Sequence, residues 1–144
     1  MNVQSILSTK GSAVATIDAS STLAQATASL RDHGVGALVV SSGGGTIEGI
    51  LSERDVVRAL AAHGAGTLGR TISSAMSTDV VTCRAEDTVD ELMAMMTARR
   101  FRHLPVVDHD GKLIGIVSIG DVVKHRLGQL ENENQQLFDY IQGR

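Results

Sequence analysis

The chain of 144 residues repeats itself without a gap when it is shifted by 66 positions. Isolated identities run along the whole repeat, among them Ile6 with Ile72 and Thr22 with Thr88. One unit of about 60 residues is too small to cover both faces of a sheet, so two copies must pack on each other. The identities are densest where Gly49, Ile50, Ser52, Asp55, Val56 and Val57 fall on Gly115, Ile116, Ser118, Asp121, Val122 and Val123. We assign 1–62 to the first copy, 63–69 to a linker, 70–127 to the second copy and 128–144 to a helical tail.

Each copy is predicted to follow the order β-α-β-β-α, which makes this an α+β protein with an additional C-terminal helix. Ser21 and Asp87 are the expected helix N-caps, and glycine-rich turns precede the third strand of each copy. Two such units can pack sheet against sheet about a pseudo-twofold axis, which creates two equivalent clefts. The expected strands are 14–17, 37–40 and 47–51 in the first copy and 80–83, 104–107 and 113–119 in the second, with later helices beginning near Glu53 and Gly120.

Composition and charge narrow the class of protein. Hydrophobic residues make up 42% of the chain and Trp is absent, so the core is expected to be aliphatic. The net charge of −3 disfavours nucleic-acid binding, which usually needs a basic surface. The single cysteine, Cys83, fits a reducing compartment, and the sequence has neither a signal-peptide pattern at residues 1–7 nor an apolar run of about 20 residues. We therefore expect a cytoplasmic protein without membrane insertion.

A motif of the form Gly-apolar-x-Ser-x-x-Asp occurs once in each copy, at 49–55 and at 115–121. Its serine stands where a strand ends and a helix begins, so the hydroxyl can cap the helix or face a phosphate. The aspartate three residues later can accept hydrogen bonds from the two hydroxyls of a ribose. A plain capping arrangement is the alternative interpretation, and the occurrence of two copies in register favours a ligand site.

This motif, together with the segment 102–108, resembles the CBS-domain pair, or Bateman module, over roughly residues 1–127. The first copy departs from the family pattern, because 36–40 lacks the proline and the basic pair of 102–108. The resemblance implies that Asp55 and Asp121 hold the ribose, and that the adenine lies between apolar strand residues in clefts that draw on both copies. The Asp121 cleft would then include Ser118, Ile116, Ala15, Val35 and Ala37, and the Asp55 cleft would include Ser52, Ile50, Val81, Arg102 and Leu104.

The two clefts are expected to differ in charge. The second copy carries four potential cations in a row of five residues, and the aligned stretch 33–37 holds only His33. Such a cluster favours a phosphate site, although a solvated helix end is an equal alternative for Arg99 and Arg100. We assign Arg100, Arg102 and His103 to phosphate binding, together with the hydroxyls of Ser52 and Ser118.

No catalytic or metal-binding set stands out in the sequence. The glycines at 43–45 are not followed by Gly-Lys-Ser/Thr, the five histidines lack ligand spacing, and Cys83 fits a small core residue. We therefore expect no enzyme, no metal and no catalytic cofactor. The expected function is a regulatory sensor that binds AMP, ADP, ATP or NAD(H) and signals to an unidentified partner. The alternatives are an interaction module with empty clefts and a sensor of S-adenosylmethionine.

From Asp121 onward the chain is predicted to form one long helix. Its apolar residues follow steps of four and three, as in a coiled-coil seam, and Asn134 falls at a position where a buried amide can fix the register. Alternatively, Leu127 and Leu130 pack on the chain's own domain and the rest frays. We expect a homodimer to which the tail contributes. The seam consists of Val123, Leu127, Leu130, Asn134, Leu137 and Ile141.

Overall fold

The structure is a computed structural model that describes residues 1–143. Its elements form two halves of the same kind, each with one three-stranded sheet. The first half has β1 (Thr16–Ile17), α2 (Leu23–His33), β2 (Ala37–Val40), β3 (Gly49–Ser52), α3 (Glu53–His63) and the 3₁₀ turn η1 (Gly64–Gly69). The second has β4 (Cys83–Arg84), α4 (Val89–Arg99), β5 (His103–Val107), β6 (Leu113–Ser118) and α5 (Ile119–Ile141). Two further short elements are α1 (Val3–Lys10) and η2 (Ile72–Ser74).

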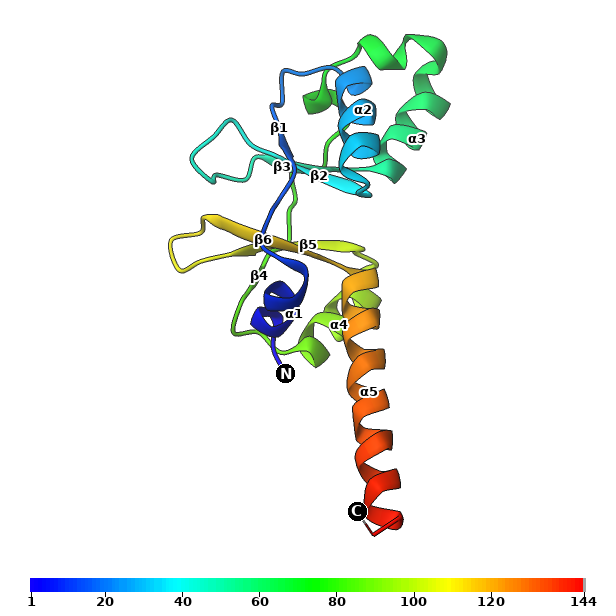
Figure 1. Ribbon diagram of the computed structural model, residues 1–144. Helices are drawn as coiled ribbons and strands as arrows, with labels where there is room; N and C mark the ends of the chain where they lie inside the picture. The colour runs from blue at the N-terminus through cyan, green and yellow to red at the C-terminus, as the bar shows by residue number, and fades with distance from the viewer. Residues whose placement is uncertain (144) are drawn as a thin grey trace.

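The two sheets have the same topology and face each other in the middle of the molecule (Figure 1). In each, the first strand runs parallel to the second, and the second runs antiparallel to the third. Both faces of β2 are buried, since Leu38 and Val40 lie in the core under the helices and Val39, on the opposite face, is also inaccessible. The predicted α+β fold of two tandem repeats with a long C-terminal helix is therefore confirmed.

The two halves exchange their first segments. Val3, Ile6 and Leu7 of α1 belong to the core of the second half, whereas Ile72 of η2 belongs to the core of the first. The sequence alignment paired Ile6 with Ile72 but did not predict this exchange, because the contacts join distant parts of the chain. The exchange also explains the motif glycines: a Cβ on Gly49 would lie 2.8 Å from Met76 and Ser77, and one on Gly115 would lie 2.8 Å from Leu7.

The helix N-caps lie one residue later than the sequence suggested. Thr22 Oγ1 accepts a hydrogen bond from the Gln25 N–H, and Thr88 caps α4 in the same way, so the assignments of Ser21 and Asp87 were wrong. Asp87 is engaged elsewhere, because its carboxylate accepts from the Arg84 N–H. The first strands are also shorter than predicted, with β1 starting at Thr16 and β4 at Cys83.

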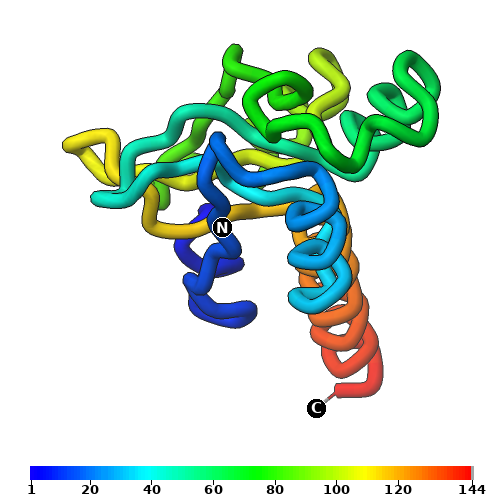
Figure 2. The backbone as a smooth tube through the Cα atoms, turned by 90° about the horizontal axis from the view of Figure 1, so that it is seen from above, coloured from blue at the N-terminus to red at the C-terminus, as the bar shows by residue number. Residues whose placement is uncertain are grey.

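Helix α5 is continuous from Ile119 to Ile141 and extends away from the rest of the molecule (Figures 1 and 2). The side chains of Leu127 and Leu137 are 55% and 59% exposed, so the predicted seam does not pack on the chain's own domain. Within residues 1–143, no helix combines the length and the apolar character that a membrane crossing requires.

Candidate functional site

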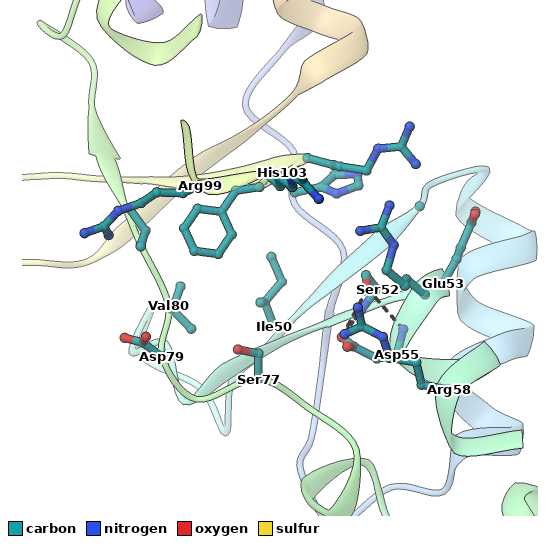
Figure 3. A pocket seen from close by; sticks show the side chains of 16 residues that line it. Ile50, Ser52, Glu53, Asp55, Arg58, Ser77, Asp79, Val80, Arg99 and His103 are labelled. Atoms are coloured by element: carbon teal, nitrogen blue, oxygen red, sulfur yellow. Dashed lines mark hydrogen bonds between the residues drawn. The ribbon is translucent and has the colours of Figure 1, made fainter. Parts of the chain in front are cut away.

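A cleft of about 460 Å³ lies where the two halves meet, which is within the usual range for a small-molecule site. One wall comes from β3 and the first two turns of α3, and the other comes from 77–81 and 99–103 of the second half. Figure 3 shows Ile50 and Val80 in the middle of the cleft, with Ser52, Asp55 and Arg58 toward one end and Arg99 on the other side of Ile50. The structure thus brings residues of both copies to one cleft.

Ser52 and Asp55 form a reciprocal capping pair at the start of α3. Asp55 Oδ2 accepts hydrogen bonds from the Ser52 N–H at 2.9 Å and from Ser52 Oγ at 3.1 Å, and the Asp55 N–H donates to Ser52 Oγ. Within residues 1–143, no hydrogen bond reaches Oδ1, so this half-buried carboxylate keeps one oxygen available. The motif therefore caps its helix and presents an acceptor to the cleft, which reconciles the two interpretations of the sequence.

Positive charge is concentrated in this cleft. Five arginines line it, against the three carboxylates of Glu53, Asp55 and Asp79, although the chain as a whole carries a net charge of −3. Within the described part of the chain, none of these arginines takes part in an ion pair of 4.0 Å or less. Unpaired guanidinium groups around one concave surface favour an anionic ligand. The five are Arg54, Arg58, Arg99, Arg100 and Arg102.

Arg100 has a backbone conformation that side chains rarely adopt. It is the only non-glycine residue within 1–143 with positive φ, at 57°, and it ends α4. The aligned residue of the first half is Gly34, which ends α2 at φ 62°. An arginine is less favourable than a glycine in this backbone conformation. Its presence here points to a role of the guanidinium group in the cleft.

His103 lies on β5, with its side chain half-buried between the two halves. Burial is the main cause that lowers its pKa below the ordinary 6.5; Glu53 and Asp121 oppose this effect, and Arg102 and Lys10 add to it. The imidazole is therefore neutral at pH 7. In this form the ring can donate a hydrogen bond to a phosphate.

The apolar part of the cleft contains both predicted and unpredicted residues. Ile50 and Val81 line it as expected, whereas Leu104 is fully buried in the second core and is not among the lining residues. Phe101 and Val80 are additional lining residues, and an aromatic ring is well suited to contact a flat base. Arg58 was also missed, although its position three residues after Asp55 places both on one face of α3.

The surroundings of Asp121, where the sequence predicted the second cleft, have a different arrangement. Ser118 and Asp121 form the same capping pair, but Asp121 Oδ2 also receives Lys10 Nζ at 2.6 Å. Burial raises the pKa of Asp121, but the hydrogen bond from Lys10, the bonds from Ser118 and the Lys10 charge outweigh it, so the pKa lies below 3.8. Of the predicted wall residues, Ala15 and Ile116 are half-buried, Val35 is exposed and Ala37 is buried.

The described part of the chain gives little support for a metal site or for a reactive thiol. Residues 1–143 contain no group of three or more His, Cys, Asp or Glu side chains that could hold a metal ion. Cys83 is 2% exposed, and burial together with the charge of Asp87 raises the pKa of its thiol to about 12.

Two similar α+β repeats with a cleft between them define a class of tandem-repeat modules. The chain belongs to the CBS-domain family, whose pattern matches residues 3–62 and 72–128. The family therefore covers most of both halves and leaves residues 1–2, the connection 63–71 and the last part of α5 outside the match.

Several known proteins are similar to this chain. It is 37% identical to the mitochondrial CBS domain-containing protein CBSX3 of Arabidopsis thaliana, over 85% of this chain and 61% of that protein. It is 32% identical to the CBS domain-containing protein YhcV of Bacillus subtilis, over 92% and 90% of the two chains. The chain thus spans about three fifths of the first relative and most of the second.

Solved structures show the same fold. The crystal structure of the CBS-domain containing protein ATU1752 from Agrobacterium tumefaciens is 44% identical, with a TM-score of 0.82 over 87% of this chain and 98% of that chain. The CBS domain pair of protein MJ0100, in complex with 5-methylthioadenosine and S-adenosyl-L-methionine, is 25% identical with a TM-score of 0.80, over 90% and 98% of the two chains. The protein PAE2072 from Pyrobaculum aerophilum, complexed with AMP, shares the fold at 23% identity and a TM-score of 0.75, over 84% and 89% of the two chains.

Proposed function

We propose that this protein is a regulatory module that binds a phosphate-bearing adenine nucleotide in the Asp55 cleft and signals its presence to a partner protein. The observation that carries the proposal is the combination of an available Asp55 oxygen with five unpaired arginines around one cleft. We propose that the nucleotide is bound and released unchanged, because the hydroxyl of Ser52 and the carboxylate of Asp55 are engaged with each other in the helix cap.

The roles of the residues follow from their chemistry. Asp55 Oδ1 accepts hydrogen bonds from the ribose hydroxyls, and Ser52 keeps the carboxylate in position. The adenine lies against the apolar side chains of Ile50, Val81 and Phe101. The phosphates extend toward Arg58, Arg100 and Arg102, with His103 as a neutral donor.

Phosphate-bearing nucleotides are favoured over S-adenosylmethionine by the charge of the cleft. MJ0100 is described with S-adenosylmethionine and 5-methylthioadenosine, so both kinds of adenosine ligand have to be considered. A sulfonium centre among five arginines meets like charge, whereas each phosphate can pair with a guanidinium. We therefore place AMP, ADP, ATP and NAD(H) ahead of S-adenosylmethionine.

Isothermal titration calorimetry with AMP, ATP, NAD(H), adenosine and S-adenosylmethionine tests this proposal directly. Asp55→Ala should weaken AMP binding at the first cleft by roughly ten- to a hundredfold, as expected for lost hydrogen bonds to a charged acceptor. Circular dichroism and thermal unfolding of the same variant control for the fold. Absence of heat with every ligand would instead support an interaction module with empty clefts.

We also propose that the protein forms a homodimer to which α5 contributes without acting alone. The seam residues from Val123 to Ile141 are exposed in the single chain, and a helix of this length needs a partner for such a face. Light scattering should report a dimer for the full chain and a weaker one after truncation following Leu127, whereas Asn134→Leu should strengthen the association. A full-length chain that stays monomeric at micromolar concentration would exclude this arrangement.

A cytoplasmic location remains our proposal for this chain, based on its composition and its buried, unpaired cysteine. One similar protein, CBSX3, is mitochondrial. Fractionation of cells that produce the protein with a small epitope tag would decide between these compartments.

A further inference from the structure

At the predicted second cleft, Asp121 is paired with a side chain of the protein itself. Lys10 Nζ lies 2.6 Å from Asp121 Oδ2 and donates a second hydrogen bond, at 2.9 Å, to the backbone carbonyl of Ile116. Both groups belong to the predicted ligand site, since Asp121 is aligned with Asp55 and Ile116 with Ile50. The ammonium group therefore pairs with the carboxylate that is aligned with Asp55, at the same oxygen that accepts the Ser118 N–H, and with the adjacent strand edge.

The first half shows the same place without a lysine. The residue aligned with Lys10 is Met76, whose apolar side chain packs against the first core. The next residue, Ser77, exchanges two backbone hydrogen bonds of 2.9 Å with Ile50. Residues 72–77 contain no charged side chain, so this segment brings no ammonium group to Asp55.

The second half replaces that backbone bridge with the lysine. Helix α1 continues as far as Lys10, and the N–H of Gly11, which is aligned with Ser77, donates to Leu7 within the helix end. The Ile116 carbonyl then lacks the backbone partner that Ile50 has, and Lys10 Nζ bonds to it instead. A lysine in the last turn of a helix is favoured by the helix dipole alone, but this side chain reaches a residue 111 positions away.

We propose that Lys10 competes with a ribose for the carboxylate of Asp121, so that an adenine nucleotide binds the predicted second cleft more weakly than it would without the lysine. This inference rests on the proposed nucleotide binding and adds a difference between the two clefts. The Asp55 cleft binds first, and the Asp121 cleft binds at higher nucleotide concentration.

The cost of displacement is moderate because the ion pair is partly open to solvent. The side chains of Lys10 and Asp121 are 31% and 25% exposed, so water screens their attraction. A partly exposed pair of this kind corresponds to about a fivefold change in an equilibrium constant. The Asp121 cleft should therefore remain accessible, with an affinity about fivefold lower than it would have without the lysine.

Displacement of Lys10 would also affect the chain segment that connects the two halves. Lys10 is followed by the exposed segment 11–13, which leads from α1 on the second half to β1 on the first (Figure 1). Gly11, at φ 96°, is the point where the chain leaves the helix. Nucleotide in the second cleft thus acts on one of the two segments that cross between the halves.

Calorimetry with AMP on the full chain tests the inference. The Asp55→Ala background isolates the second cleft, and Lys10→Met places there the residue that the first half has at the aligned position. We expect Lys10→Met to raise AMP affinity about fivefold in this background and to leave the first cleft unchanged in a chain with native Asp55. Lys112→Met, which removes an exposed lysine from the hairpin turn, is the matched control and should change neither value.

The outcomes separate this inference from the proposed function. AMP binding to the Asp55 cleft, with a second cleft indifferent to Lys10→Met, would overturn only the role of Lys10. No AMP binding in any variant would overturn the proposed function and, with it, the inference. A measurement without nucleotide tests the contact itself: the carboxyl group of Asp121, followed by NMR, should titrate at higher pH in Lys10→Met than in the native chain.

Discussion

Arg100→Gly should make the protein more stable and its nucleotide binding weaker. Arg100 has φ 57° at the end of α4, where the aligned residue of the first half is a glycine. A side chain in this conformation costs roughly 1–2 kcal/mol, and glycine loses about 0.5–1 kcal/mol of this gain through its more flexible unfolded chain. The net expected gain is therefore about 0.5–1 kcal/mol in the free energy of unfolding.

The change in stability can be measured as a shift in melting temperature. For a chain of 144 residues, an entropy of unfolding of about 2.1 cal/mol/K per residue makes 1 kcal/mol equivalent to about 3 °C. Differential scanning calorimetry should therefore show Tm higher by about 2–3 °C in Arg100→Gly. Loss of one exposed guanidinium from the cleft should lower ATP affinity by about fivefold at the same time.

Arg100→Ala is the matched control for this prediction. It removes the same guanidinium but keeps a Cβ at positive φ, so ATP affinity should fall as in Arg100→Gly while Tm does not rise. Arg100→Lys should keep part of the ATP affinity. If Arg100→Gly binds ATP as tightly as the native chain, the side chain has no role in the cleft, and a Tm no higher than that of Arg100→Ala would refute the argument from backbone strain.

Three further predictions follow from single residues. Arg102→Ala should weaken ATP and NAD(H) binding more than adenosine binding, because its guanidinium faces phosphate charge; equal losses in calorimetry across the three ligands would assign Arg102 to the fold or the base. The pKa of Asp121 is depressed below 3.8, so the stability it contributes is present above that pH and is lost as the pH falls through the lower, folded-state value. In acid titrations followed by circular dichroism, native protein should therefore lose more stability than Lys10→Met below pH 3.8, and parallel curves would contradict the Lys10 contact. Cys83, with a pKa of about 12 and 2% exposure, should react with a thiol reagent only after addition of denaturant, and rapid labelling of the folded chain would show that the second core opens.

The sequence predicted the local parts of this structure better than its long-range contacts. The positions of Ser52 and Asp55 at a strand-to-helix junction followed from one short motif, because capping depends on residues three apart. Arg102 was likewise found in the Asp55 cleft, where the resemblance to CBS-domain pairs had placed it. The N-caps were misplaced by one residue, since Ser21 and Thr22 have similar propensities and only the hydrogen bond from Gln25 distinguishes them.

The exchanged segments could not be predicted in the same way. Ile6 and Ile72 were recognised as equivalent, yet periodicity does not specify which core an apolar side chain enters. The contact from Lys10 to Asp121 joins residues 111 positions apart and has no local pattern. Leu104 was taken for a wall of the cleft because a strand residue with an apolar side chain can face either the ligand or the core, and register decides between them.

The differences between the two copies add positive charge near both aspartates. Where the first copy has glycine at 34 and 36, the second has Arg100 and Arg102, and these arginines line the cleft of Asp55 rather than their own Asp121. Where the second copy has Met76, the first has Lys10, and this lysine reaches across to Asp121. Because each copy completes the cleft of the other, each substitution in one copy changes the site centred on the other's aspartate. The two copies therefore form an open, cationic cleft at Asp55, whereas Asp121 is paired with an internal ammonium group. Under the proposed function, the chain would respond to nucleotide over two concentration ranges, and only the second range would move the segment that begins at Gly11.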